Sequence, residues 1–351
     1  MSKEIISWLF DKGGPVVKWL AFKHFEVDVP GYDESRLREG LIESNLVKKW
    51  LKNLDEAQYI HGSFDTCLEN VIGKLIEFGL DVTFAPVGEE IKRRHDRWHE
   101  LAKEDRLAKK FYLVLLGSLL LRMGIRDLEI EDFARQRLSD LAEFLKNCPK
   151  DFYMSDEEKL ENKVPKSMRD KSFIKREFFR DEELMLPQID DVTTYAILQK
   201  IDGSEKTHKN IQKIVSFALS EDYQNLKPGF GLGLYGKKAY GIGWSCDLPG
   251  YFGFSAPDEM SAHFVMRVEL ISNFSFAAKH EWIQSCIGYL EQFGTNSGTY
   301  LFPRNLLCEK DGYYVSGAHM GLEEARRDSK SMQIESTFRM LRILSKINKI
   351  N

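Results

Sequence analysis

Two adjacent aspartates, Asp190 and Asp191, are the most suggestive residues for chemistry in this chain. They stand in LPQIDDVTTYAILQKI, residues 186–201, after a proline and at the start of an apolar run with helical spacing. A carboxylic acid that its surroundings keep protonated can donate a proton at neutral pH, so the pair is a candidate acid site. Aspartate is also a preferred N-cap and is stabilised at the positive end of a helix. The sequence leaves both interpretations open.

A second candidate site would hold zinc. Cys246 and Asp247 are neighbours, and His319 follows in SGAHMGL. This set resembles the Asp, Cys and His ligands of protein prenyltransferases, although here the cysteine and aspartate are adjacent and reversed. The resemblance would imply a catalytic zinc with an open fourth position. Scattered residues of these types also occur by chance in a chain of 351 residues, so the sequence assigns no cofactor.

The stretch 298–329 gathers arginine, tyrosine and histidine side chains with little apolar periodicity. Its members are Tyr300, Arg304, Tyr313, Tyr314, His319, Arg326 and Arg327. Arginines among aromatic rings can hold a carboxylate or phosphate above an apolar pocket. They can equally pair with Glu323, Glu324 and Asp328 on the surface.

Helical periodicity extends over most of the chain. Apolar residues at helical spacing on both sides of the Gly-Gly-Pro at 13–15 predict a short helical hairpin with Pro15 at the first position of its second helix. Further helices are predicted at about 34–53, 64–79, 86–106, 107–123, 128–146, 191–201, 206–220, 258–274, 278–293 and 332–348. Few segments alternate with period two, so an all-α fold is expected.

Two stretches interrupt this periodicity. Residues 149–186 are dense in charges of both signs, which predicts a charged insertion, either a solvated linker or a lid. Residues 228–257 combine glycines with aromatics, including Tyr240 and Trp244. An irregular loop this apolar is expected to cover or line something.

Composition limits which partners and which cellular location are expected for this protein. The net charge of −4 gives no electrostatic case for nucleic acid. The longest apolar run, Phe111–Gly124, falls short of the ~20 residues of a membrane-spanning helix, and the N-terminus lacks the features of a signal peptide. Five cysteines without a CxxC pair argue against a disulfide framework, so a reducing, cytoplasmic location is expected.

A weak internal repeat supports an array of helical pairs. Three predicted helices end with glycine followed closely by an aromatic residue, at 60–66, 223–231 and 288–303. Glycine permits a sharp exit from a helix, and the aromatic ring can fold back onto the next pair.

The stretch GYLEQFGTNSGTY, residues 288–300, resembles the glutamine-tryptophan repeat of squalene-hopene cyclases and related prenyltransferases, with Tyr300 where tryptophan is usual. The segments 8–25 and 334–347 look like the opening and closing helices of small relatives. The resemblance implies an α/α toroid, a ring of helical hairpins around a central cavity, in one domain spanning 1–351.

The same resemblance implies roles for particular residues. The family's acid motif, Asp-x-Asp-Asp-Thr-Ala, is similar to the segment 188–193, with Gln188 replacing the first aspartate and Val192 the threonine. Asp190 would then be the acid and Asp191 its partner. Tyr240 and Trp244 would line the cavity and steady a cation. His61 and Asp65, in HGSFDT, would lie near the same helix ends.

Two functions follow as hypotheses. The first is a prenyltransferase-like or terpenoid cyclase-like toroid that binds an apolar, isoprenoid-like molecule in its cavity, with acid catalysis by Asp190. The second is a non-catalytic helical-repeat protein that binds a peptide or protein partner. A closed, aromatic-lined cavity would favour the first, and a centre filled by large side chains would favour the second.

Overall fold

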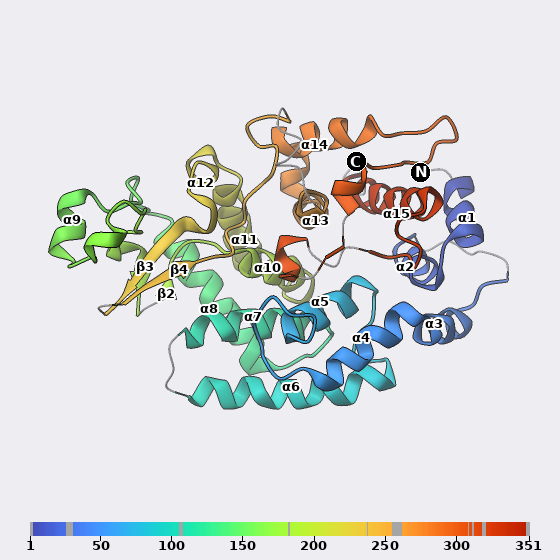
Figure 1. Ribbon diagram of the computed structural model, residues 1–351, viewed down its shortest axis with the longest axis horizontal. Coiled ribbons are helices and arrows are strands. Elements are labelled where there is room, and N and C mark those ends of the chain that lie inside the picture. The colour runs from blue at the N-terminus through green and yellow to red at the C-terminus, as the bar shows by residue number, and fades with distance from the viewer. Residues whose placement is uncertain are drawn as a thin grey trace. The chain divides into compact units, whose positions relative to one another are not determined.

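The computed structural model describes residues 3–25, 31–104, 108–181, 183–236, 238–254, 262–307, 309–310, 312–317 and 321–348. Its contacts divide the chain into two compact units. Unit 1 comprises Met1–His99, Arg122–Ile125 and Pro249–Asn351, and unit 2 comprises Glu100–Leu121 and Arg126–Leu248. Helices dominate the described residues and the strands are few and short (Figure 1), which confirms the prediction of a mostly helical protein.

Unit 1 contains the two ends of the chain. Its helices are α1 (Lys3–Lys12), α2 (Pro15–Phe25), α3 (Glu34–Glu43), α4 (Asn45–Glu56), α5 (Leu68–Glu77), most of α6 (Ala85–Lys103), α13 (Ala262–Ile271), α14 (Glu281–Glu291) and α15 (Ser329–Asn348). The predicted N-terminal hairpin is confirmed, with Pro15 as the first residue of α2. Helices α1 and α2 contact each other, and both contact α15 (Figure 1).

Unit 2 contains the rest of the helices and the four strands. Its elements are α7 (Lys109–Arg122, up to Leu121), α8 (Leu128–Phe144), α9 (Asp156–Glu161), β1 (Phe179–Arg180), β2 (Glu183–Leu184), α10 (Ile189–Ile201), α11 (Glu205–Ala218), α12 (Glu221–Gln224), β3 (Gly231–Tyr235) and β4 (Lys238–Ile242). Helix α7 is buried on nearly all sides, as its continuous apolar run predicts. No helix among the described residues is long and apolar enough to span a membrane.

The glycine-rich stretch forms a β-hairpin that the sequence did not predict. Strands β3 and β4 pair antiparallel, with Gly231 opposite Ile242 and Tyr235 opposite Lys238. Glycines at alternate positions of β3 replace the side chains whose period of two would mark a strand. A Cβ on Gly233 would lie 2.8 Å from the Tyr240 ring, so a larger residue there would displace that ring.

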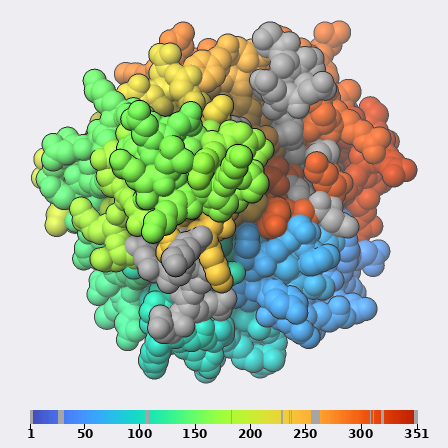
Figure 2. Space-filling model, turned by 60° about the vertical axis from the view of Figure 1, so that its left-hand side comes forward, coloured from blue at the N-terminus to red at the C-terminus, as the bar shows by residue number. Residues whose placement is uncertain are grey.

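The charged insertion, 149–186, carries a small apolar core of its own. Met154, Val164 and Phe173 are buried together, and Leu232 and Leu234 of β3 pack against them. The backbone of Ile174 also donates a hydrogen bond to the carbonyl of Leu232, 2.8 Å long. The charged residues lie around this core, and the part of the segment near α9 faces the viewer in green in Figure 2. The insertion is therefore a packed region of unit 2.

Two glycines of unit 1 give a matched pair of expected stabilities. A Cβ on Gly73, inside α5, would lie 2.5 Å from the ring of Tyr314, whose side chain is buried and accepts a hydrogen bond from Arg122. We expect Gly73→Ala to lower the free energy of unfolding by about 1–3 kcal/mol through overpacking. Gly40 in α3 has open space around its Cα. Gly40→Ala should therefore raise that free energy by about 0.5–1 kcal/mol, through helix propensity alone.

Urea unfolding of the two variants checks this pair. The packing of α5 against Tyr314 would be contradicted if both alanines changed stability in the same direction by the same amount.

Candidate functional site

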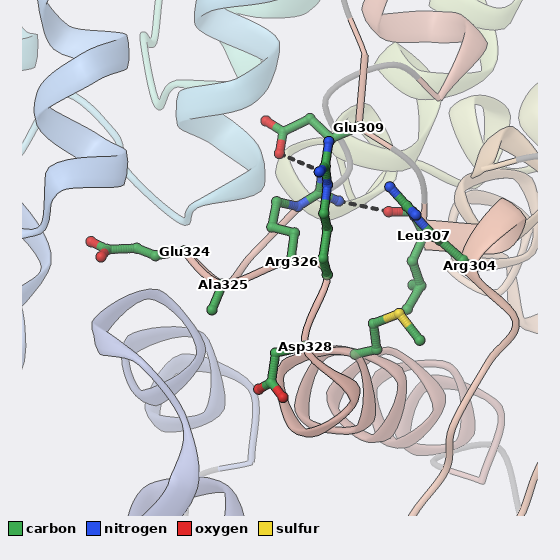
Figure 3. A pocket seen from close by; sticks show the side chains of 9 residues that line it. Arg304, Leu307, Glu309, Glu324, Ala325, Arg326 and Asp328 are labelled. Carbon is green, nitrogen blue, oxygen red and sulfur yellow. Dashed lines mark hydrogen bonds and ion pairs between the residues drawn. The ribbon is translucent and has the colours of Figure 1, made fainter.

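A hollow of about 600 Å³ opens in unit 1 beside the start of α15 (Figure 3). It is lined by Arg304, Leu307, Glu309, Glu324, Ala325, Arg326, Arg327, Asp328 and Met332. We call it the arginine cleft. The short 3-10 helix Arg304–Leu307, the segment 324–328 and the first turn of α15 form its walls. It contains Arg304, one of the site residues that the sequence predicts.

Arg326 is fixed at the base of the arginine cleft. Its Nη1 lies 2.6 Å from Oε2 of Glu309, and its Nη2 donates a 2.6 Å hydrogen bond to the carbonyl of Leu307, both drawn as dashed lines in Figure 3. Gly321 lies beside it, and a Cβ there would clash with the Arg326 side chain. The guanidinium is therefore clamped by backbone and carboxylate together.

Arg304 and Arg327 have a different environment. Both side chains are exposed, and neither makes an ion pair or side-chain hydrogen bond with another described residue. The acidic residues expected to neutralise this stretch form no ion pair with these two arginines among the described residues. Asp328 accepts hydrogen bonds from the backbone and hydroxyl of Ser331, and Glu324 extends away from Arg326 in Figure 3. Two arginines thus remain available to a ligand in the cleft.

A buried lysine lies behind Glu309. Lys74 of α5 is fully buried, donates a 2.5 Å hydrogen bond to the carbonyl of Gly321, and has its Nζ 3.6 Å from Oε1 of Glu309. Burial lowers the pKa of Lys74 to about 8, although Glu309 favours the charged form. The carboxylate of Glu309 therefore lies close to two cations, Lys74 and Arg326. Their charges offset its negative charge, so it repels an anion in the cleft only weakly.

The chain that leads into the cleft is anchored on both sides. The backbone N–H of Leu322 donates to Oε2 of Glu335 at 3.1 Å, and Oε1 of Glu323 accepts a 2.8 Å hydrogen bond from the backbone of Gly14. Burial raises the pKa of Glu323 to about 7. These contacts connect the cleft to α15 and to the turn between α1 and α2, and they hold the following residues, 324–328, in place.

Deeper in unit 1, charged side chains join α5, α13 and α15. Arg339 lies 2.7 Å from Glu77, 3.1 Å from Glu269 and 2.9 Å from Glu335, and Arg342 binds Glu269 as well. All five are buried. Burial alone would raise the pKa of Glu77, but Arg339 and Arg342 hold it well below its ordinary value. These ion pairs connect the three helices.

The predicted acid pair lies in unit 2, where the side chain of Asp191 is held by an arginine and by a backbone hydrogen bond. Arg137 of α8 donates to both oxygens of Asp191, at 3.1 and 3.0 Å. The same carboxylate accepts a 2.9 Å hydrogen bond from the backbone of Gln188 and completes a capping box at the start of α10. Burial alone would lower the pKa of Arg137, but Asp191 and then Glu183 raise it. Asp191 is thus an acceptor in three bonds, as the helix-start interpretation expects.

Beside this pair lies a small cavity of about 10 Å³, lined mainly by α7, α8 and α10. The hydroxyls of Ser118 and Tyr195 border it, and neither has a hydrogen-bond partner among the described residues. The volume suits roughly one water molecule, which such a pair of hydroxyls can bind. Asp190 is also buried, and its carbonyl accepts a 2.7 Å hydrogen bond from Thr194.

His61 and Asp65 share one loop of unit 1 but have separate partners. His61 contacts Glu69 through Nδ1, and its ring stacks on Tyr313 with 5.2 Å between centroids. Asp65 lies 3.5 Å from the ammonium group of Lys49. The sequence identified His61 and missed Glu69, because a carboxylate at the start of a helix looks like a simple helix-stabilising residue.

The other predicted residues are dispersed. Tyr240 lies in β4, and the carbonyl of Trp244 accepts a 2.8 Å hydrogen bond from Ile189, which places its backbone at the start of α10. Tyr300 donates its backbone N–H to Thr337 of α15 at 2.9 Å. Cys246 is fully buried, and among the described residues it joins no cluster of three candidate metal ligands, nor does Asp247. His319 lies outside the described residues.

Comparison with protein-family models, with curated proteins and with solved structures found no match to this chain.

Proposed function

We propose that this protein binds a small molecule bearing a carboxylate or phosphate group in the arginine cleft. The observation that carries the proposal is the pair of exposed arginines, Arg304 and Arg327, that line the hollow without an ion pair among the described residues. Guanidinium groups hold carboxylates and phosphates through paired hydrogen bonds. Three arginines and three carboxylates line the hollow. Glu309 is engaged by Arg326 and Lys74, and Asp328 accepts hydrogen bonds from Ser331, so Arg304 and Arg327 are the cations left for a ligand.

The apolar part of the lining suggests what else the ligand carries. Leu307, Ala325 and Met332 border the same hollow. A hydrocarbon chain can pack there while its charged end is held by the arginines, as in most small-molecule sites. This agrees with the expectation of an isoprenoid-like or other apolar ligand and adds an anionic group to it.

The α/α toroid is part of the proposal. Consecutive helices of unit 1 pack in pairs from α1 to α5, and the last helix, α15, contacts α1 and α2, as a closed array of hairpins requires. Binding is favoured over acid catalysis, because Asp191, the expected partner of the acid Asp190, is engaged by Arg137 and by the backbone at the helix start. A protein-binding, non-catalytic function for the array stays a prediction.

Calorimetric titration with three matched probes, octyl phosphate, octanoate and octanol, tests the proposal. We expect the two anions to bind and octanol to bind at least about tenfold more weakly, because a hydrogen bond to a charged group contributes about 1.5–3 kcal/mol. Arg304→Gln and Arg327→Gln should each weaken the binding of the anions about tenfold and leave octanol unchanged. Added salt should weaken anion binding in the wild type.

Arg36→Gln is the matched control, since Arg36 is an exposed arginine in unit 1 whose ion pair among the described residues is with Asp33, three residues before it. Equal affinity for octanol and octyl phosphate, or wild-type binding by both cleft variants, would refute anion recognition at this site.

A further inference from the structure

Two histidines of unit 1 lie one turn apart on helix α6. His95 and His99 stand four residues apart in the stretch HDRWH, residues 95–99. Side chains at this spacing project from the same face of a helix. Helix α6 is continuous from Ala85 to Lys103 (Figure 1), so one rigid element carries both imidazoles.

The two imidazoles meet through one nitrogen of each ring. Nε2 of His95 and Nε2 of His99 are 3.2 Å apart, and the ring planes are nearly perpendicular, at 89°. Zinc binds imidazole nitrogen at about 2.0–2.1 Å, so two nitrogens of a tetrahedral site lie roughly 3.3 Å apart. Two adjacent nitrogens of an octahedral site lie roughly 3.0 Å apart at the same bond length. The observed separation is between these values, so one metal ion can bind both nitrogens with little movement of either side chain.

Neighbouring groups orient both rings. The ring of His99 packs edge-to-face on Trp98, with 5.2 Å between centroids, and Trp98 is itself buried. Nδ1 of His95 lies 3.9 Å from Oδ1 of Asp96, a separation at which the attraction is electrostatic and not a hydrogen bond. A carboxylate on this side of the ring favours the proton on Nδ1, which leaves the lone pair of Nε2 for a metal ion.

The charges and the exposure around the pair admit a cation. Two arginines of the preceding turn, Arg93 and Arg94, are paired with the carboxylate of Glu90. The side chain of His95 is 24% exposed and that of Asp96 is 69% exposed, so a hydrated ion can reach the imidazoles from solvent. The carboxylate of Asp96 adds a negative charge beside them, which attracts a divalent cation.

We propose that His95 and His99 bind a divalent transition-metal ion, zinc in the first instance, through their two Nε2 atoms. Neutral imidazole nitrogen is a ligand that zinc, copper and nickel share. Neither ring has to lack other contacts, because the ion replaces the hydrogen between the two Nε2 atoms and each Nδ1 keeps its own neighbours. Water fills the remaining positions, so this is an open site and not a closed structural one. The proposal does not depend on the arginine cleft.

Calorimetric titration of the full-length protein with zinc chloride and with magnesium chloride tests this site. We expect zinc to bind, and magnesium, which prefers oxygen ligands, not to bind. His95→Gln and His99→Gln should each weaken zinc binding at least about tenfold, because each variant removes one of the two protein ligands. Circular dichroism of each variant checks that the helical fold is kept.

His208→Gln is the control, since His208 is an exposed histidine of α11 and its removal should leave zinc binding unchanged. Wild-type zinc affinity in either His95→Gln or His99→Gln would overturn the proposal. If a variant fails to fold, the wild type decides alone, through peptide mapping after brief treatment with diethyl pyrocarbonate. Excess zinc should slow the modification of His95 and His99 several-fold, because coordination occupies the reactive lone pair, and should leave His208 unaffected. Equal rates at His95 and His99 with and without zinc would overturn the proposal.

Discussion

Replacing Arg339 with methionine is expected to lower the free energy of unfolding by about 3–5 kcal/mol. Arg339 is fully buried and lies within 2.7–3.1 Å of Glu77, Glu269 and Glu335. Its loss would leave Glu77 and Glu269 with Arg342 as their arginine partner, and Glu335 with the backbone N–H of Leu322. Uncompensated buried charge is among the few causes of very large single-residue effects.

Urea unfolding measures this effect, because urea adds no ions that would screen the network. The control is Arg36→Met, which breaks an ion pair whose side chains are 77% and 59% exposed. That variant should change stability by less than about 1 kcal/mol. A loss in Arg339→Met no larger than in the control would show that the buried network does not support unit 1.

The corresponding change in unit 2, Arg137→Met, is also expected to lower the free energy of unfolding by about 3–5 kcal/mol. Arg137 is the buried partner of Asp191 and also lies 3.2 Å from Glu183. Methionine fills most of the space of the arginine side chain. The loss of stability therefore measures the cost of leaving the buried Asp191 carboxylate without its arginine, and not the cost of a cavity. Glu183 keeps a second partner, Lys110, at 3.0 Å, and therefore contributes less to the loss.

A double variant separates the ion pair from the fold around it. In Arg137→Met with Asp191→Leu, both charges are gone, and most of the lost stability should return. About 1 kcal/mol should stay missing, because the carboxylate also caps α10 through the backbone of Gln188. If the double variant were less stable than Arg137→Met alone, the stranded charge would not be the cause of the loss.

The sequence identifies some residues of the candidate sites but not the residues that they contact. Arg304 and His61 could be identified because arginine and histidine suit anion binding and proton transfer wherever they occur. Their partners could not be identified. Glu69 and Glu309 are ordinary charged residues in the sequence. Glu69 meets His61 through the fold of one local loop, and only long-range packing brings Lys74 to Glu309.

Local sequence determined the helices. Apolar spacing predicts the hairpin of α1 and α2 with Pro15 at the head of α2, and a continuous apolar run predicts the buried helix α7. These are short-range properties, set by the backbone conformation and by which side chains avoid water. The pair Asp190–Asp191 also predicts a helix start, and the capping by Asp191 agrees with it.

Tertiary structure alone decided the rest. The hairpin of β3 and β4 is a local pairing whose glycines hide the period-two pattern, and what it packs on, the small core of the segment 149–186, is distant in sequence. Helix α5 looks amphipathic, with Glu69, Lys74 and Glu77 interspersed among apolar residues, yet all of these charges are buried. A charge is buried only where another element brings an opposite charge to it, and neither periodicity nor composition records which distant residue will do so.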